Sequence, residues 1–267
     1  MFRTRLFSGI VLVVLALIFI IHGGALLLVV LGIVSLIGLY ELYRVFNVER
    51  SVGIAGYAAC VVFYLNMWFQ FLPDVMMMIL LFLIVCMCFF VFGYPRFQFS
   101  QIIGVFFGFF YVAVMLSCVY LTRNIAGGTY LVWLIFISAW GCDTCAYCGG
   151  MLFGKHKMTP KLSPKKTVEG AIGGVVGAFL LAIIYWLIFH YWMGTDWKYM
   201  LLMAVVCAAG ALVAMLGDLA ASAIKRQYDV KDFGRLIPGH GGIMDRFDSV
   251  IFVAPVIYLL SLYIIVR

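Results

Sequence analysis

Apolar runs of about 20 residues repeat from one end of this chain to the other, with only short polar breaks between them. Because a helix rises about 1.5 Å per residue, each run is long enough to cross the roughly 30 Å hydrocarbon core of a bilayer. The runs lack the period-two alternation of a membrane β-barrel. With 66% hydrophobic and 11% charged residues, the chain is excluded as an ordinary soluble domain. The sequence therefore predicts an all-α, polytopic integral membrane protein.

The apolar runs predict nine transmembrane helices. Only His22 and two glycines separate the first two runs, which predicts a tight helical hairpin. The start of the chain is also similar to a signal peptide, but no small-residue cleavage site follows, so a retained first helix is preferred. The predicted spans are 6–22, 25–43, 53–72, 75–93, 103–121, 129–152, 170–193, 198–219 and 248–266.

Lysine and arginine residues gather on one side of this nine-span topology. All of the 18 except Arg123, Lys198 and Arg267 lie on the side of the N-terminus. Because cytoplasmic loops carry an excess of Lys and Arg, this side is predicted to face the cytoplasm from the inner cell membrane and to carry any active site. The net charge of +7 then suits anionic lipid headgroups or a nucleotide, and no nucleic-acid partner is expected.

The polar residues divide the chain into two predicted regions. Residues 1–125 form a scaffold of apolar helices, and residues 126–267 form a catalytic region. All eight cysteines fall inside predicted spans, which argues against a disulfide framework. Cys142, Cys145 and Cys148 have the spacing of a cluster motif, but they drift around a helix by roughly 60° per step and lack an adjacent fourth ligand. A packing role is preferred for them.

Asp143 is the first of three polar intrusions into the apolar helices. It lies in the sixth span, twelve residues or roughly 18 Å of helix before Lys155. A carboxylate inside a membrane segment costs about 2.5 kcal/mol or more, so it needs a cation, a proton or a water-filled cavity. A metal or substrate ligand is preferred to a structural partner for a buried base.

The second intrusion is the lysine loop, residues 154–170, which reads GKHKMTPKLSPKKTVEG. Lysine, serine and threonine beside a helix start form a natural phosphate site, although the Walker A spacing is absent. A positive-inside loop explains the lysines equally well. The following residues Gly170, Gly173, Gly174 and Gly177 predict a face for close helix packing.

The third intrusion brings together further carboxylates. Asp218 and Ser222 are four residues apart and share a helix face, and Asp245 and Asp248 share one at the start of the ninth helix. Complementing the helix dipole explains one acid there but not the whole set. Carboxylates from neighbouring helices suit Mg²⁺ shared with substrate phosphates. The predicted metal ligands are Asp143, Asp218, Asp245 and Asp248.

The signature segment, residues 222–248, reads SAIKRQYDVKDFGRLIPGHGGIMDRFD. It resembles the signature of the phosphatidate cytidylyltransferase (CDP-diacylglycerol synthase) family. The stretches DTCAYCGGMLFGKHK from residue 143 and SPKKTVEG from residue 163 also resemble that family. The resemblance covers roughly residues 140–250, whereas the first half is similar only in being apolar.

This resemblance implies that phosphatidate and CTP react to give CDP-diacylglycerol and pyrophosphate. It implies Mg²⁺ as the cofactor, with K⁺ as a possible second cation, the lipid bilayer as a partner and a possible homodimer. Lys165, Lys166 and Thr167 would hold CTP phosphates, and His240 would donate to a phosphate or cap a turn. The catalytic set is Asp218, Asp245, Asp248, Lys225, Arg226, Arg246 and His240, and the substrate-binding set is Lys155, Lys157, Ser163, Lys165, Lys166, Thr167, Ser222 and Lys231.

Two other functions remain open from the residues. One is a related CTP-using membrane enzyme, acting on an archaeal ether lipid or as a polyprenol kinase, although the signature segment argues against the kinase. The other is a transporter whose intramembrane acids bind a coupling ion. Transporters usually carry paired broken helices in two halves, whereas the polar chemistry here lies in one half, which disfavours this function.

Overall fold

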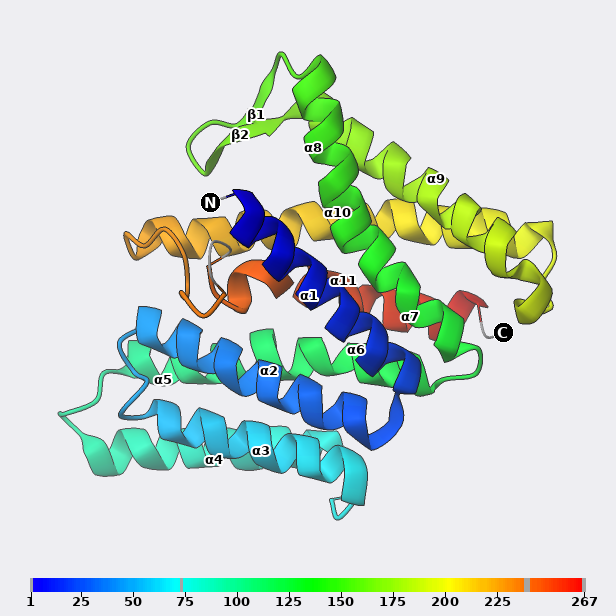
Figure 1. Cartoon of the computed structure of the whole chain (residues 1–267). Helices are drawn as coiled ribbons and strands as arrows, with labels where there is room; N and C mark the ends of the chain where they lie inside the picture. The colour runs from blue at the N-terminus through cyan, green and yellow to red at the C-terminus, as the bar shows by residue number, and fades with distance from the viewer. Residues whose placement is uncertain (1, 73, 238–240, 266–267) are drawn as a thin grey trace. The chain divides into compact units, whose positions relative to one another are not determined.

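Helices account for most of the protein in the computed structural model, which describes residues 2–72, 74–237 and 241–265 (Figure 1). Two longer helical stretches contain a π-helical segment (η) in their middle. The elements are α1 (Phe2–His22), α2 (Gly24–Val45), α3 (Gly53–Phe69), α4 (Val75–Gly93), α5 (Phe99–Gly108), η1 (Phe109–Val114), α6 (Met115–Asn124), α7 (Gly128–Phe136), η2 (Ile137–Gly141), α8 (Cys142–Phe153), β1 (Lys157–Thr159), β2 (Ser163–Thr167), α9 (Val168–Met193), α10 (Trp197–Gln227), α11 (Met244–Leu260) and η3 (Ser261–Ile265).

The predicted spans coincide with helical segments throughout the described chain. Seven of these segments are long and apolar enough to cross a membrane, and Val11–His22 and Gly53–Phe69 are shorter apolar helices. The prediction of a helical polytopic membrane protein is therefore confirmed. The count of nine spans and the side on which the site opens stay predictions.

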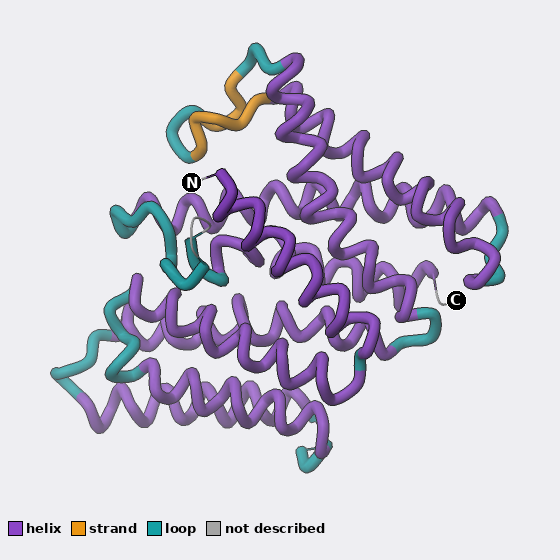
Figure 2. The backbone as a smooth tube through the Cα atoms, viewed as in Figure 1, coloured by secondary structure: helices purple, strands orange, loops and turns teal. Residues whose placement is uncertain are grey.

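Strand structure within the described residues is confined to one hairpin (Figure 2). Strands β1 and β2 pair antiparallel, with Lys157 opposite Thr167 and Thr159 opposite Ser163. The hairpin occupies the lysine loop between α8 and α9. Its return strand therefore carries Lys165 and Lys166 directly into the start of α9.

The chain forms two compact units. The first contains residues up to Ser117 together with Val230–Arg246, and the second contains Cys118–Asp229 together with the chain from Phe247. The chain therefore passes from one unit to the other inside α6, after α10 and inside the first turn of α11. The predicted division at residue 125 concerns function rather than packing, and it stays a prediction.

Tyr43 is the centre of packing in the first unit. Its ring is fully buried, and its hydroxyl donates a hydrogen bond of 2.7 Å to the carbonyl oxygen of Val105. A Cβ atom added at Gly56 on α3 or at Gly108 on α5 would overlap the Tyr43 side chain. The two glycines therefore give the phenol the space that it occupies between the helices, as small residues do at membrane helix interfaces.

Small residues also bring α8 and α9 together in the second unit. A Cβ atom at Gly149 would lie 3.4 Å from the Cα atom of Gly173, and one at Gly174 would lie 2.8 Å from the Cys142 sulfur. The predicted glycine face is thus confirmed. Cys142 is buried in a cluster with Ala178 and Ala211, so it has the packing role predicted from the sequence. Cys148, by contrast, is exposed.

We predict that Gly56→Ala lowers the melting temperature of the protein. The new methyl group would overlap the Tyr43 phenol, and overpacking a core costs about 1–3 kcal/mol. Gly32→Ala is the matched control, because its Cβ atom would meet the Tyr64 ring at an ordinary 3.5 Å. Thermal unfolding in detergent should leave the control unchanged or more stable. Equal destabilisation by the two substitutions would contradict the packing described around Tyr43.

Candidate active site

A cavity of about 520 Å³ lies in the second unit, among α8, the hairpin, the start of α9 and α10. Its volume is within the usual range for small-molecule sites, about 300–1,000 Å³. Met158 and Met215 contribute apolar wall. Five residues of the predicted site also line it, namely Asp143, Lys165, Lys166, Thr167 and Asp218.

Asp143 enters this cavity from the first turn of α8. The π-helical segment η2 ends directly before α8, and such interruptions of an α-helix are frequent at functional sites. The hydroxyl of Ser249, on α11, donates to Asp143 Oδ2 at 3.3 Å. A hydroxyl from a helix distant in the sequence therefore satisfies part of the hydrogen-bonding capacity of the Asp143 carboxylate.

Lys166 and Asp218 form an ion pair at the cavity wall. Lys166 comes from β2 and Asp218 from α10, and their side chains are 25% and 26% exposed. Ser222, one turn beyond Asp218, donates to Asp218 Oδ1 at 3.5 Å, the upper limit of a hydrogen bond. The predicted common face of Asp218 and Ser222 is thus confirmed, and the pair joins the hairpin to α10.

Asp248 is a third carboxylate of this neighbourhood. It is 8% exposed and interacts electrostatically with Asp218, Lys225 and Asp143. Its Oδ1 atom accepts the backbone N–H of Ser249 at 2.8 Å. Lys166 from β2 and Lys225 from α10 therefore offset part of the negative charge of three acids from α8, α10 and α11.

The start of α9 fixes the hairpin beside the cavity. The Thr167 hydroxyl oxygen caps α9 by accepting the Gly170 N–H at 3.1 Å. Glu169 accepts the N–H of Lys155 at 3.0 Å and pairs with His156 Nδ1 at 2.5 Å. These bonds hold the two ends of the hairpin together. The sequence places Asp143 roughly 18 Å of helix before Lys155, at the start of the lysine loop. Because the hairpin folds back, Lys166 nevertheless lines the same cavity as Asp143.

The other predicted residues of the second unit lie away from the cavity lining. Lys157 is exposed on β1, Lys155 is exposed just before the hairpin, and Ser163 is half-buried opposite Thr159. Arg226 is exposed in the last turn of α10. The assignment of Lys155, Lys157 and Ser163 to substrate binding stays a prediction, and so does the catalytic role of Arg226.

The remaining predicted residues belong to the first unit. Lys231 is exposed, and Arg246 is half-buried. Asp245 is buried, and its Oδ2 atom accepts the backbone N–H groups of Phe233 at 2.9 Å and Gly242 at 3.0 Å. His240 lies outside the described residues.

Glu41 is a buried acid that the sequence analysis did not identify, and Ser249 and Arg44 are further residues that it did not place at these contacts. Glu41 lies on α2, it is 3% exposed, and its carboxylate accepts the N–H groups of Ile243 at 3.1 Å and Met244 at 2.9 Å. Arg44 on the same helix donates to the Phe233 carbonyl oxygen at 2.7 Å. The sequence does carry a signal for Glu41, because an acid inside an apolar run needs a cation, a hydrogen-bond donor or water, as Asp143 does.

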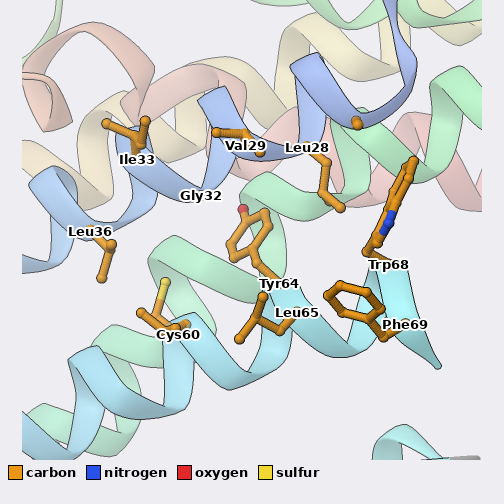
Figure 3. Close-up of a pocket in the computed structure, with 12 residues that line it drawn as sticks. Leu28, Val29, Gly32, Ile33, Leu36, Cys60, Tyr64, Leu65, Trp68 and Phe69 are labelled. Carbon is orange, nitrogen blue, oxygen red and sulfur yellow. The ribbon is translucent and has the colours of Figure 1, made fainter. Parts of the chain in front are cut away.

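A second cavity, of about 400 Å³, lies between α2 and α3 in the first unit. Leu28, Val29, Leu65 and Trp68 line its wall (Figure 3). The Tyr64 hydroxyl at this wall is hydrogen-bonded to Ser35 at 2.8 Å. No charged residue is among those that line it, so it suits hydrocarbon rather than phosphate.

The carboxylates of the cavity in the second unit fit a magnesium ion by their chemistry, since Mg²⁺ prefers oxygen ligands. Across the part of the chain that the structure describes, no three His, Cys, Asp or Glu side chains are placed to bind one metal ion. Magnesium, however, is commonly held by one or two carboxylates, with substrate phosphates and waters completing its coordination. Asp143 and Asp218, which line one cavity with two lysines, fit a metal that binds together with phosphates.

Comparison with known proteins gives consistent relatives over nearly the whole chain. The cytidylyltransferase family matches residues 3–264. The protein named phosphatidate cytidylyltransferase in Staphylococcus aureus (strain COL) is 33% identical over 265 residues, covering 97% of this chain and 98% of its own. Proteins of the same name in Staphylococcus haemolyticus (strain JCSC1435) and Staphylococcus epidermidis (strain ATCC 12228 / FDA PCI 1200) are 32% identical over 263 residues, with the same coverage.

Proposed function

The chain belongs to the cytidylyltransferase family, and we propose that it is a phosphatidate cytidylyltransferase. It transfers a cytidylyl group from CTP to phosphatidate, giving CDP-diacylglycerol and pyrophosphate for phospholipid synthesis. The observation that carries the proposal is one cavity, in a helical membrane protein, lined by Asp143, Lys165, Lys166, Thr167 and Asp218. This reaction requires cationic side chains to bind the phosphates and acidic side chains to hold a metal ion.

The reaction needs positioning and charge neutralisation more than a strong base. An oxygen of the phosphatidate phosphate attacks the α-phosphorus of CTP, and the bond to the bridging oxygen of the β-phosphate breaks to release pyrophosphate. A phosphate monoester is largely dianionic near neutral pH, because its second pKa is about 6. Placing two polyanions together is therefore the main obstacle, and fixed cations lower it.

The hairpin supplies the groups for the CTP phosphates. Lys165 and Lys166 are point charges, the Thr167 hydroxyl can donate while its oxygen caps α9, and the helix start favours anions. Lys166 is paired with Asp218, so a phosphate that binds Lys166 competes with, or joins, that pair. Lys225, Arg226 and Arg246 are proposed to meet phosphatidate or the leaving pyrophosphate.

Magnesium is the proposed cofactor, with Asp218 as its principal ligand and Asp143 and Asp248 as supports. When bound, it would neutralise the negative charge of the phosphates. Asp245 as a ligand, K⁺ as a second cation and His240 as a phosphate donor remain further proposals. The predicted inner-membrane location, the cytoplasmic site and a homodimer are proposed on the lysine and arginine distribution and on the family resemblance.

We predict that purified protein in micelles releases pyrophosphate from CTP and Mg²⁺ only when phosphatidate is present. Replacing phosphatidate by diacylglycerol should stop the release, because the attacking phosphate is missing. A lipid kinase would instead release CDP from CTP with an alcohol acceptor. Absence of pyrophosphate release across a range of phosphatidates would refute the enzyme, and CDP release would favour the kinase.

We predict that Lys166→Ala raises the KM for CTP by roughly tenfold to a hundredfold. Hydrogen bonds to charged groups contribute about 1.5–3 kcal/mol, and each 1.4 kcal/mol is about tenfold in affinity. Lys161→Ala is the matched control, because Lys161 lies in the exposed turn of the same hairpin and outside the cavity lining. Steady-state kinetics with varied CTP measure both variants. An unchanged KM in Lys166→Ala would remove the lysine from the phosphate site.

We predict that Asp218→Asn raises the Mg²⁺ concentration needed for half-maximal activity by about tenfold or more, because a neutral amide binds a divalent cation less well than a carboxylate. Asp196→Asn controls for the same chemical change at the opposite end of α10, where asparagine caps a helix as well as aspartate. Titration of Mg²⁺ at saturating substrates measures the shift. The same Mg²⁺ dependence in both variants would exclude Asp218 as the metal ligand.

A further inference from the structure

Two buried carboxylates hold the signature loop, which we define as the described residues 228–237 and 241–243 between α10 and α11. Asp245 accepts the N–H of Phe233 from the first part of the loop and the N–H of Gly242 from its end. The Ile237 N–H also donates to the Gly241 carbonyl oxygen at 2.9 Å. These bonds close the loop on itself, and they place the Asp245 carboxylate against its backbone.

Glu41 and Arg44 connect that loop to α2. The Glu41 carboxylate accepts the N–H of Ile243 through Oε1 and the N–H of Met244 through Oε2. Arg44 donates to the Phe233 carbonyl oxygen, and it also interacts electrostatically with Glu41. The described loop is therefore attached to α2 at Phe233 and at its last residue, Ile243.

The glycines of the loop leave the space that the Glu41 and Asp245 carboxylates occupy. A Cβ atom at Gly234 or at Gly242 would overlap the Glu41 carboxylate. Gly241 has a φ of +82°, and a Cβ atom there would lie 2.9 Å from Asp245 Oδ2. Side chains at these positions would displace one of the two acids. The glycine-rich pattern thus follows from the close approach of Glu41 and Asp245 to the backbone.

The contact between Glu41 and α11 has a clear physical basis. The first N–H groups of a helix have no partner within the helix, and a negative charge near a helix start is favourable. Hydrogen bonds to a charged acceptor are also stronger than neutral ones. Glu41 supplies these interactions to the first residue of α11, Met244, and to the residue before it.

We propose that Glu41 is a positioning residue for the reaction, which fixes the start of α11 and thereby the place of the Asp245 carboxylate. This inference rests on the proposed function, because Asp245 is there proposed as a further metal ligand. Glu41 itself touches the backbone of Ile243 and Met244 rather than substrate. Its loss should therefore lower turnover more than it weakens CTP binding, since the cavity that Lys165 and Lys166 line belongs to the other unit.

The test compares Glu41→Gln with Glu49→Gln. Glutamine keeps the length of the side chain, but it replaces one of the two acceptor oxygens by an NH2 donor that would face a backbone N–H. Glu49 lies just after α2 and undergoes the same chemical change outside the contacts with the loop. We expect kcat of Glu41→Gln to fall roughly tenfold to a hundredfold, as when a partner of a metal ligand is lost. The KM for CTP should change less than about twofold.

Hydrogen–deuterium exchange without substrates gives an independent readout. Amides of residues 241–246 should exchange faster in Glu41→Gln than in wild type, and Glu49→Gln should match wild type. If Glu41→Gln does not fold, Arg44→Lys weakens the other attachment, because lysine lacks the guanidinium fork. It should show a smaller fall in kcat and faster exchange near Phe233.

The outcomes separate this inference from the proposed function. Wild-type kcat in Glu41→Gln, or unchanged exchange in residues 241–246, would overturn the positioning role while leaving the enzyme assignment intact. A lower melting temperature with kcat and KM unchanged would also overturn it, because Glu41 would then serve stability alone. If wild type itself gives no lipid-dependent pyrophosphate release, the proposed function fails, and the positioning role fails with it.

Discussion

Charge inside an apolar helical protein is the constraint on which this structure depends. A carboxylate among membrane helices needs a cation, a hydrogen-bond donor or water. The protein meets this need in different ways: Lys166 pairs with Asp218, Ser249 donates to Asp143, and backbone N–H groups surround Glu41. Each of these solutions ties together segments that are distant in the sequence but belong to the same compact unit.

The candidate site shows how a short hairpin extends the chemistry of membrane helices. Helices α8 and α10 carry acids, but a helix alone offers few groups for a nucleotide phosphate. The hairpin folds back on the start of α9, where Thr167 caps the helix, and it places Lys165 and Lys166 at the cavity wall. The close packing of α8 on α9 through glycines supports this arrangement. Basic and acidic side chains thus share one cavity.

The first half of the chain is more than a passive scaffold. Glu41 and Arg44 hold the backbone of the signature loop from α2, and the loop's glycines leave room for the Glu41 carboxylate. The polar residues of the second half alone do not reveal this connection between α2 and the loop. The connection also shows why the signature segment combines charges with glycines, since two acids approach its backbone closely.

The sequence by itself determined the helical membrane class, the glycine face of α9 and the family resemblance, because long apolar runs, local spacing and a specific signature are written in consecutive residues. It also identified the charged residues that line the cavity, together with Thr167, but not its apolar wall. Only the tertiary structure decided their partners. The Lys166–Asp218 pair and the Ser249–Asp143 bond join separate elements, and Glu41 binds a backbone N–H 202 residues away. Hydrogen bonding to backbone groups leaves no side-chain pattern, so such contacts depend on how the chain folds.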